Sequence, residues 1–515
     1  MRSFVRRNVI TFLLFVLVVA VGVFLVPAIG PAWDEPDNIH SAGRYILFFQ
    51  KGFDPKVLFN PDWTVSYFGD KIFTQNPSIY RYPPVPNYVG GVLTLFGTAL
   101  GMKMTAPNIF IAFHLATVLF FALLVAVVYR FCKLLGLTTA ISVLAALVTF
   151  LYPTLFGHGL SNLKDTAQTA LFALSLYLLV MGSWKHIRHD IVLGAIVWGF
   201  AMATKFNAIF VPVIWILWLL VTKKTVFTIL KSTCVLVIVG LATTFVVWPV
   251  LWFHPITSVS EVIKYFTTVG QGYAIFWNGV TYQAGAGQTL WWYPWVNLTN
   301  QTPFLLLFFI VIGICRALAP KKNFSIILIW LLIPLLRAAD PYVAFYDGIR
   351  HFMEVLPAWI ILGAIGVETL WTTRAKWLYG IVGVLIIGQL VYINWLYFPY
   401  STGYYNAIAN NPNTNFDRDI EALTVRDGMD YLHAHYKNLR LWLYIGGHLS
   451  WYSLAPGDQY VYTQDEADAT ILINKGSHIT PGAFESRFLK GEFVLVHTIT
   501  RGSAVFGWVY KRKYQ

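Results

Sequence analysis

The sequence predicts a polytopic α-helical membrane protein that ends in a small C-terminal extracytoplasmic α/β domain. Three observations support this prediction. Only 12% of the 515 residues are charged and 57% are hydrophobic, whereas soluble domains carry about 25% charged residues. Long apolar runs recur along residues 1–397. From residue 398 onward the sequence changes to a polar pattern of short strand-like runs and one helix.

Eleven segments have the length and composition expected of membrane spans. A crossing helix needs about 20 mostly apolar residues, because the hydrocarbon core is about 30 Å thick. The predicted spans are 8–29, 108–129, 138–156, 166–183, 191–204, 206–222, 233–252, 303–318, 324–339, 353–371 and 377–397. The apolar core of the first span is too long for a cleavable signal peptide. We therefore expect about 11 transmembrane helices within residues 1–397.

The distribution of charge predicts how these spans are oriented. The net charge of +13 could indicate a nucleic-acid partner. However, alternate short loops together hold fifteen basic residues and one acid, while the loop 30–106 and the tail 398–515 are each neutral. Lys and Arg collect in the cytoplasmic loops of membrane proteins. The charge therefore predicts a cytoplasmic N-terminus and an extracytoplasmic C-terminus, and no nucleic acid is needed to explain it.

The predicted outer side carries three polar regions, namely the loop 30–106, the loop 253–302 and the tail. Within the first loop, residues 87–101 are apolar but too short to cross a membrane, so we expect an interfacial or re-entrant helix there. The second loop ends in WWYPW (291–295), an aromatic cluster typical of a membrane interface.

The tail has the pattern of a compact α/β or α+β domain of about 110 residues. A helix is expected over 417–436, with Asn415 or Asp417 as its N-cap. Strand-like runs follow at 439–446, 459–464, 469–474, 491–499 and 505–511. Since the whole chain has only three Cys, a disulfide scaffold is excluded.

Ionisable residues from distant parts of the sequence gather at the outer ends of the predicted spans. Charged groups at membrane depth are costly, so they are candidate functional residues. They are Asp34, Glu35, Arg81, His158, Lys164, Asp165, Lys205, Arg337, Asp340, Asp347, Arg350, His351 and Glu354. A site for an anionic lipid headgroup needs this combination, because cations hold the phosphate and a carboxylate accepts a proton.

Each of these residues also has a purely structural interpretation. Asp34, Glu35 and Pro36 could cap a helix, and Lys164 and Asp165 could cap the fourth span after Ser161 or Asn162. Lys205 could extend to the membrane interface. Arg350 and His351 could form a closed ion cluster with Asp347 and Glu354. Their shared location on one side of the membrane is the observation that favours a functional site.

Several motifs, in order along residues 1–411, resemble a known family. They are WDEPDNIHSAGRY (33–45), RYPPVPNYVGG (81–91), LSNLKDTAQTALFALSLYLL (160–179), GFAMATKFNAIFVP (199–212), WWYPWVNLTNQTPFLLL (291–307), YDGIRHFMEVLPAWIIL (346–362) and FPYSTGYYNAIANN (398–411). Together they resemble the polyprenyl-phosphate-sugar-dependent membrane glycosyltransferases of family 39. This family has the GT-C fold and includes protein O-mannosyltransferases and lipid A aminoarabinose transferases.

The resemblance implies an inverting transfer of a sugar, mannose or another hexose or pentose, from a polyprenyl-phosphate donor to a protein, lipid or glycan acceptor at the outer membrane face. It implies the following roles: Asp34 as general base, Glu35 as its support or as the group that orients the acceptor, Asp165 as a second acid, and Arg81, Lys164, Lys205, Arg350 and His351 as ligands of the donor phosphate. The β-trefoil insert of eukaryotic protein mannosyltransferases has no counterpart here, so the plasma membrane of a bacterium or archaeon is the expected location.

The resemblance requires no cofactor, although the acids could also coordinate Mg²⁺ or Mn²⁺. The sequence has no Gly-rich phosphate loop, which argues against a nucleotide-sugar donor. The alternative function is a transporter or flippase for a lipid-linked or anionic substrate. Such a protein would place its ionisable residues near the membrane midplane, on repeated broken helices.

Overall fold

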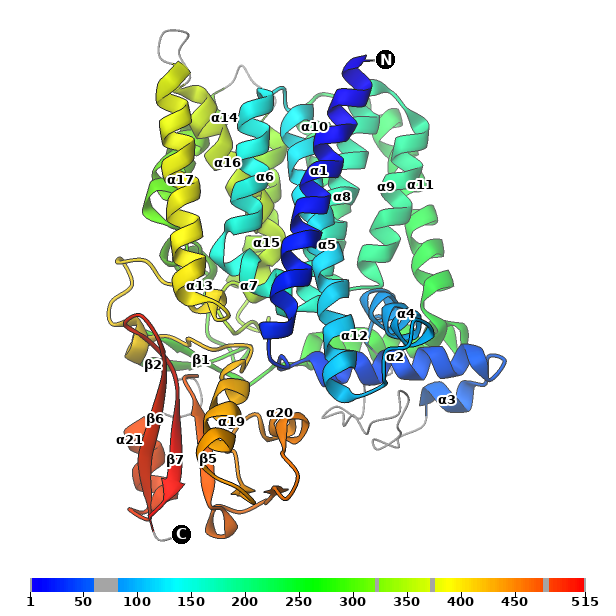
Figure 1. Ribbon diagram of the computed structural model, residues 1–515. Coiled ribbons are helices and arrows are strands. Elements are labelled where there is room, and N and C mark those ends of the chain that lie inside the picture. Colours follow the sequence, from blue (N-terminus) through cyan, green and yellow to red (C-terminus); the bar gives the residue numbers. More distant parts are fainter. Residues whose placement is uncertain (1, 60–81, 320–323, 371–375, 476–480, 514–515) are drawn as a thin grey trace.

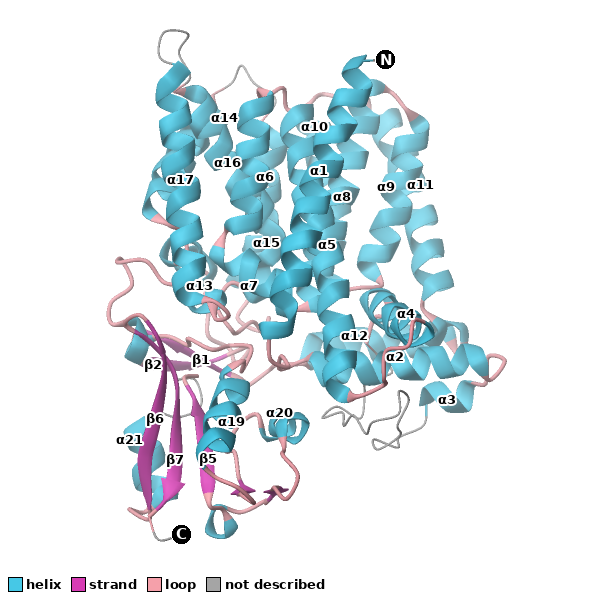
Figure 2. Cartoon of the chain, in the orientation of Figure 1, coloured by secondary structure: helices cyan, strands magenta, loops and turns pink. Residues whose placement is uncertain are grey.

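The computed structural model describes residues 2–59, 82–319, 324–370, 376–475 and 481–513. Most of the chain is one bundle of roughly aligned helices, and the strands lie beyond one end of it (Figures 1 and 2). The bundle contains α1 (Arg2–Leu25), α5 (Ala106–Leu134), α6 (Thr139–Leu151), α8 (Leu163–Lys185), α9 (Arg188–Met202), α10 (Phe210–Val221), α11 (Val226–Val247), α14 (Phe304–Leu318), α15 (Ser325–Leu336), α16 (Leu356–Thr369) and α17 (Lys376–Tyr397). A helix therefore lies at each predicted span.

The apolar helices confirm the membrane character that the sequence predicts. Within the described residues, six helices are long and apolar enough to cross a membrane, or seven if α6 and α7 (Pro153–Ser161) form one bent span. The helices α10, α14 and α15 are apolar but shorter. The number of crossings, predicted as about 11, stays a prediction.

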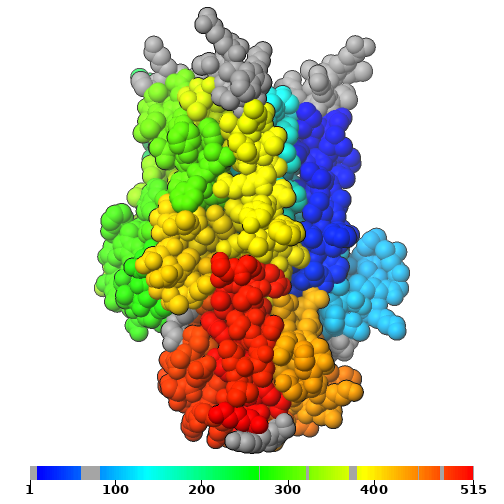
Figure 3. Space-filling model, turned by 60° about the vertical axis from the view of Figure 1, so that its left-hand side comes forward, coloured from blue at the N-terminus to red at the C-terminus, as the bar shows by residue number. Residues whose placement is uncertain are grey.

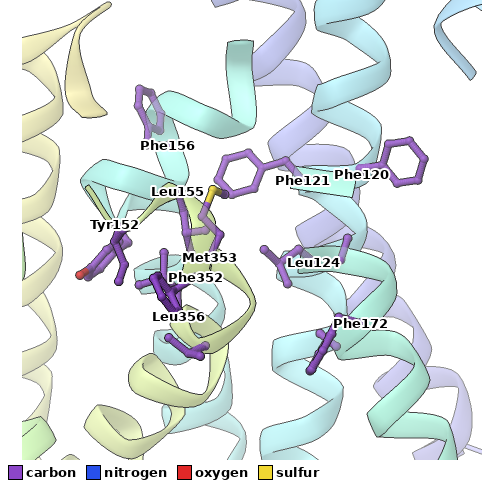
Figure 4. Packing of buried hydrophobic residues seen from close by; sticks show 14 of the residues in the cluster. Phe120, Phe121, Leu124, Tyr152, Leu155, Phe156, Phe172, Phe352, Met353 and Leu356 are labelled. Carbon is purple, nitrogen blue, oxygen red and sulfur yellow. The ribbon is translucent and has the colours of Figure 1, made fainter. Parts of the chain in front are cut away.

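Aromatic side chains fill the centre of the bundle around α5 (Figure 4). Phe121 and Leu124 of α5 are completely buried, and Phe172 of α8 stacks against Trp330 of α15. Lipid tails are as apolar as these side chains, so close packing is what favours helix association. The tightest pair is α14 with α16, where a Cβ on Gly313 would lie 1.8 Å from the Leu362 carbonyl oxygen.

A bend of 60° between α6 and α7 shapes the end of the bundle where the candidate residues lie. The bend occurs at Pro153, whose ring nitrogen cannot donate a hydrogen bond to the preceding turn. The helix α7 therefore leaves the line of α6 and leads to Asn162, the N-cap of α8. This path buries His158 beside the start of α8.

Short helices cover the same end of the bundle, and α2 (Glu35–Gln50) lies across it (Figure 1). The others are α3 (Pro55–Phe59), α4 (Val85–Ala99), α12 (Pro255–Thr268) and α13 (Tyr293–Asn300). The helix expected over 87–101 is thus present as α4. The loop 253–302 also contains an antiparallel hairpin of β1 (Ala274–Trp277) and β2 (Val280–Gln283), which the sequence analysis did not predict.

The C-terminal residues form a mixed sheet that packs directly against the end of the bundle (Figure 3). The strand order is β4 (Gln459–Tyr460), β3 (Arg440–Leu441), β5 (Ala469–Ile473), β7 (Ala504–Arg512) and β6 (Phe493–Arg501). The strand β3 is parallel to both of its neighbours, and the β5–β7 and β7–β6 pairs are antiparallel. The short helices α18 (Pro412–Asn415), α20 (Gly447–Ser450) and α21 (Pro481–Phe484) connect these elements.

The predicted helix of this domain begins later than expected. The helix α19 is Thr424–His435, and neither Asn415 nor Asp417 caps it. Asp419 accepts hydrogen bonds from the backbone N–H groups of Leu423 and Thr424 instead. The residues before α19 form a compact turn because two of their N–H groups bond to the end of β5 rather than to a helix.

Candidate active site

The start of α8 carries two of the predicted site residues. The Asn162 side chain accepts a hydrogen bond from the Asp165 backbone N–H at 3.1 Å and therefore caps the helix. The capping alternative is thus right for Asn162, but the side chains of Lys164 and Asp165 do not cap the helix. Both extend into a cluster of charged groups.

Asp34 lies at the other side of this cluster, directly before α2. Its side chain makes no capping hydrogen bond to α2. Its Oδ2 atom lies 3.4 Å from the Lys164 ammonium and 3.2 Å from an Arg350 guanidinium nitrogen. Burial opposes ionisation of this carboxyl group, but the charges of Lys164 and Arg350 outweigh burial and lower the pKa of Asp34 to about 2.

Arg350 is the centre of the cluster, and its side chain is only 5% exposed. It precedes α16 in a 3₁₀ turn, Arg350–Val355. Four carboxylates surround its guanidinium: Asp34 at 3.2 Å, Asp165 at 3.4 Å, and Asp347 and Glu421 at 3.5 Å. Burying an arginine is tolerable only when its charge is compensated in this way.

Lys205 and His351 complete the predicted set on the far side of Asp165. The Lys205 ammonium lies 2.6 Å from the Asp165 carboxylate. The His351 ring packs against Tyr346, with 4.3 Å between the ring centroids. Glu354 pairs with Arg337 rather than with Arg350, so the closed ion cluster considered from the sequence does not form as expected.

A cavity of about 450 Å³ opens onto these groups. Its lining combines charged side chains, an imidazole, tyrosines and loop residues. The lining includes Asp34, Tyr82, Lys164, Lys205, Tyr265, Arg337, Tyr346, Arg350 and His351. Lys164 also lies 4.7 Å from the centroid of the Tyr82 ring. The cavity lining thus includes four cations, Lys164, Lys205, Arg337 and Arg350, and two carboxylates, Asp34 and Asp340.

One predicted site residue, Glu35, lies away from the cavity, and a second, Arg81, cannot be placed. Glu35 is buried behind the cavity, where its carboxylate lies 3.0 Å from His114 Nε2 and accepts the Ala32 backbone N–H. Burial raises the pKa of Glu35, although the charge of His114 opposes this rise. Arg81 lies outside the described residues.

Glu421 is a member of the cluster that the sequence analysis missed. Its carboxylate is 1% exposed and lies 3.0 Å from the Asn162 side-chain nitrogen and 3.2 Å from His158 Nδ1. The residue lies in the C-terminal domain, within a neutral polar segment that has no distinctive spacing. Only the packing of that domain against the bundle brings it to Arg350.

The donor atoms of the cluster suit an anion better than a metal ion. Each of its carboxylates already contacts Lys or Arg, so a divalent cation would have to displace these partners. Across the described residues, no group of three or more His, Cys, Asp or Glu is arranged to hold a metal ion.

Comparison with known proteins gives a match in structure but not in sequence. No protein-family model matches the chain, and no curated protein matches it. The crystal structure of ArnT from Cupriavidus metallidurans in the apo state matches with a TM-score of 0.51 and 13% identity, over 97% of both chains. The same protein bound to undecaprenyl phosphate matches with a TM-score of 0.51 and 14% identity, over 98% of this chain and 97% of that one.

The chain has the fold of ArnT, which is a GT-C fold. The fold implied by the motif resemblance is therefore confirmed, and the match includes the C-terminal domain because it covers nearly the whole of both chains. At this level of identity the likeness concerns the fold. What the cavity does has to be argued from its own residues.

Proposed function

We propose that this protein is a membrane glycosyltransferase that moves a sugar, mannose or another hexose or pentose, from a polyprenyl-phosphate donor to a protein, lipid or glycan acceptor. The observation that carries the proposal is the contact of one carboxylate, Asp34, with two cations, Lys164 and Arg350, at the wall of a cavity. The fold shared with ArnT, which has been solved with undecaprenyl phosphate, supports the same donor class.

In the proposed reaction the donor phosphate binds between Lys164, Lys205 and Arg350. The bond between the anomeric carbon and the phosphate oxygen breaks as the acceptor oxygen attacks that carbon from the opposite face. The phosphate leaves with the electron pair, and the cations stabilise its charge. Asp34 takes the proton of the acceptor hydroxyl. A single displacement of this kind inverts the configuration of the sugar.

Phosphate binding would also change the state of Asp34. In the free protein Lys164 and Arg350 are engaged with Asp34, which keeps it ionised but a weak base. A phosphate that takes over these two cations would remove the interactions that lower the pKa of Asp34. The base would then be strengthened by the donor that it is needed for, and the donor would bind before the acceptor.

The location of the cluster favours transfer over transport. The cluster lies at the end of the bundle next to the C-terminal domain, and its members begin or precede helices. A transporter would be expected to hold such groups at the midplane of broken, repeated helices. We propose that this end of the bundle faces away from the cytoplasm, in agreement with the basic loops at the opposite end.

The test uses the full chain in liposomes with undecaprenyl-phosphate mannose and, separately, a polyprenyl-phosphate pentose, and measures the release of polyprenyl phosphate with added membrane extract as acceptor source. We expect Asp34→Asn to lower kcat by about 10²–10⁴-fold, the range of general-base catalysis. Asp54→Asn is the matched control, because Asp54 lies in the same loop and bonds only to a nearby backbone N–H in the described structure.

Equal activity of Asp34→Asn and the unaltered protein would contradict the role of Asp34. Movement of the intact donor across the liposome membrane without any cleavage would support transport instead.

A further inference from the structure

The C-terminal domain surrounds Trp33, the residue that precedes Asp34. The Trp33 backbone N–H donates to the Glu421 carbonyl oxygen at 3.0 Å. The Trp33 carbonyl oxygen accepts a hydrogen bond from His448 Nε2 at 3.2 Å, and the two rings meet edge to face. The Lys475 ammonium lies 5.0 Å from the centroid of the Trp33 ring. Two parts of this domain, at Glu421 and His448, thus hold the backbone next to Asp34, and Lys475 faces the Trp33 ring.

The same domain also holds Arg350 through two buried charges. The Glu421 carboxylate lies 3.5 Å from Arg350 Nη1. Lys475 Nζ lies 2.9 Å from Asp347, and another oxygen of Asp347 lies 3.5 Å from the same Nη1 atom. Arg350 Nη2 faces Asp34 instead. Nη1 therefore lies within ion-pair distance of Glu421 and of Asp347, the partner of Lys475, whereas Nη2 faces Asp34 and Nε faces Asp165.

Glu421 and Lys475 belong to one structural unit although they are 54 positions apart in the sequence. The N–H groups of Arg418 and Asp419, just before Glu421, both donate to the carbonyl oxygen of Asn474, the neighbour of Lys475. The unit is anchored to the bundle by Arg426, whose guanidinium donates to the Pro27 carbonyl oxygen at 2.9 Å. A shift of the domain would consequently move both charges together.

We propose that Glu421 and Lys475 are positioning residues, through which the C-terminal domain sets the distance between Asp34 and the phosphate-binding edge of Arg350. This inference rests on the proposed function. It makes the domain a component of the transfer site rather than a separate module that only recruits an acceptor. Neither residue needs to touch the donor, because each acts through Arg350, Asp347 or Trp33.

The kinetic test compares Glu421→Gln, Glu421→Asp and Lys475→Met with Glu466→Gln. Glu466 is an exposed acid of the same domain, so its replacement makes the same chemical change away from the cluster. We expect kcat to fall by about 10–100-fold in Glu421→Gln and Lys475→Met, as for other groups that orient a functional side chain. The KM for the donor should change little, because Lys164, Lys205 and Arg350 remain. Glu421→Asp keeps the charge and should recover part of kcat.

A second measurement does not depend on activity. Hydrogen exchange of the Trp33 amide, followed by mass spectrometry of peptides around residues 29–37, should be faster in Glu421→Gln and Lys475→Met and unchanged in Glu466→Gln. Lys475→Met provides the test alone if Glu421→Gln does not fold.

Unchanged kcat together with unchanged exchange would overturn the inference, and so would a rise in donor KM without a fall in kcat. If the unaltered protein transfers no sugar, the proposed function fails. Faster exchange in the two variants would still support the positioning of Trp33, and unchanged exchange would overturn it.

Discussion

Two neighbouring acids at the start of α2 lie in opposite environments. Asp34 faces the cavity, where Lys164 and Arg350 lower its pKa to about 2. Glu35 faces the core, where burial raises its pKa and its partners are one imidazole and one backbone N–H. The two side chains are one carbon different in length and adjacent in sequence. The direction in which each side chain leaves α2 decides which of them can meet a substrate.

The comparison shows how a pair of carboxylates can divide two tasks. Lys164 and Arg350 keep the Asp34 carboxylate charged at the surface of the cavity, where a phosphate could replace it as their partner. The core side uses its carboxyl group to hold the turn Ala32–Glu35 against α5 through His114. These contacts favour the proposed chemical role for Asp34 and predict a structural role for Glu35, whereas the family resemblance assigns both residues to the reaction.

Lys205→Met is the change on the cavity side for which we expect the largest loss of the three variants considered next. It removes a cation from the proposed phosphate site and leaves Asp165 without its partner at 2.6 Å. Loss of one group that stabilises a developing negative charge typically costs about 10²–10³-fold in kcat. The measurement is the rate of donor cleavage in liposomes.

Lys133→Met is the matched control for Lys205→Met. Lys133 lies in the last turn of α5, away from the cavity, and donates a hydrogen bond to a backbone carbonyl oxygen. Lys205→Arg should retain more activity than Lys205→Met, since it keeps the charge. Full activity of Lys205→Met would exclude Lys205 from the phosphate site. Among the described residues that line the cavity, Lys164, Arg337 and Arg350 would then be the remaining cations.

The sequence identified most of the cluster because the membrane limits where charges can lie. Asp34, Lys164, Asp165, Lys205 and Arg350 come from four separate segments, yet each stands next to an apolar span with few other charges. The cost of burying an ion makes such residues conspicuous. The repeated apolar runs predicted the helix bundle because each is long enough to form a membrane-crossing helix.

The sequence could not identify Glu421, the hairpin β1–β2, or the start of α19 at Thr424. Glu421 is one acid among many in a polar domain, and its role depends on a contact with His158, 263 positions away. The separation of Asp34 from Glu35 was equally hidden, because adjacent acids have the same local pattern. Tertiary packing alone decides these features.

Lys164→Met should lower the rate of transfer at neutral pH, because it removes one of the proposed phosphate ligands, and should also change the pH dependence of transfer. With the pKa of Asp34 near 2, the carboxylate stays ionised throughout the range above pH 4. Removing Lys164 takes away one of the two charges that lower this pKa, so the pKa rises toward its ordinary value of 3.8. Because a base acts in its ionised form, the loss of activity at acidic pH should begin at a higher pH in the variant.

The measurement is kcat/KM for the donor between about pH 3.5 and 8. Lys205→Met provides the comparison, because Lys205 contacts Asp165 rather than Asp34. A downward displacement of the acidic limb in Lys164→Met would contradict the contact with Asp34 as the cause of the lowered pKa.

Glu35→Gln should have the smallest effect on transfer. The glutamine can place its carbonyl oxygen where one Glu35 oxygen accepts the Ala32 N–H and meets His114 Nε2, so the turn before α2 stays in place. Glu35→Ala removes both bonds and leaves buried groups unpaired, at a cost of about 1–3 kcal/mol in stability. The apparent unfolding temperature in detergent should therefore fall for Glu35→Ala and stay nearly constant for Glu35→Gln, while kcat of Glu35→Gln stays close to that of the unaltered protein. A loss of kcat in Glu35→Gln as large as that in Asp34→Asn, without loss of stability, would show that Glu35 takes part in the reaction as the motif resemblance implies.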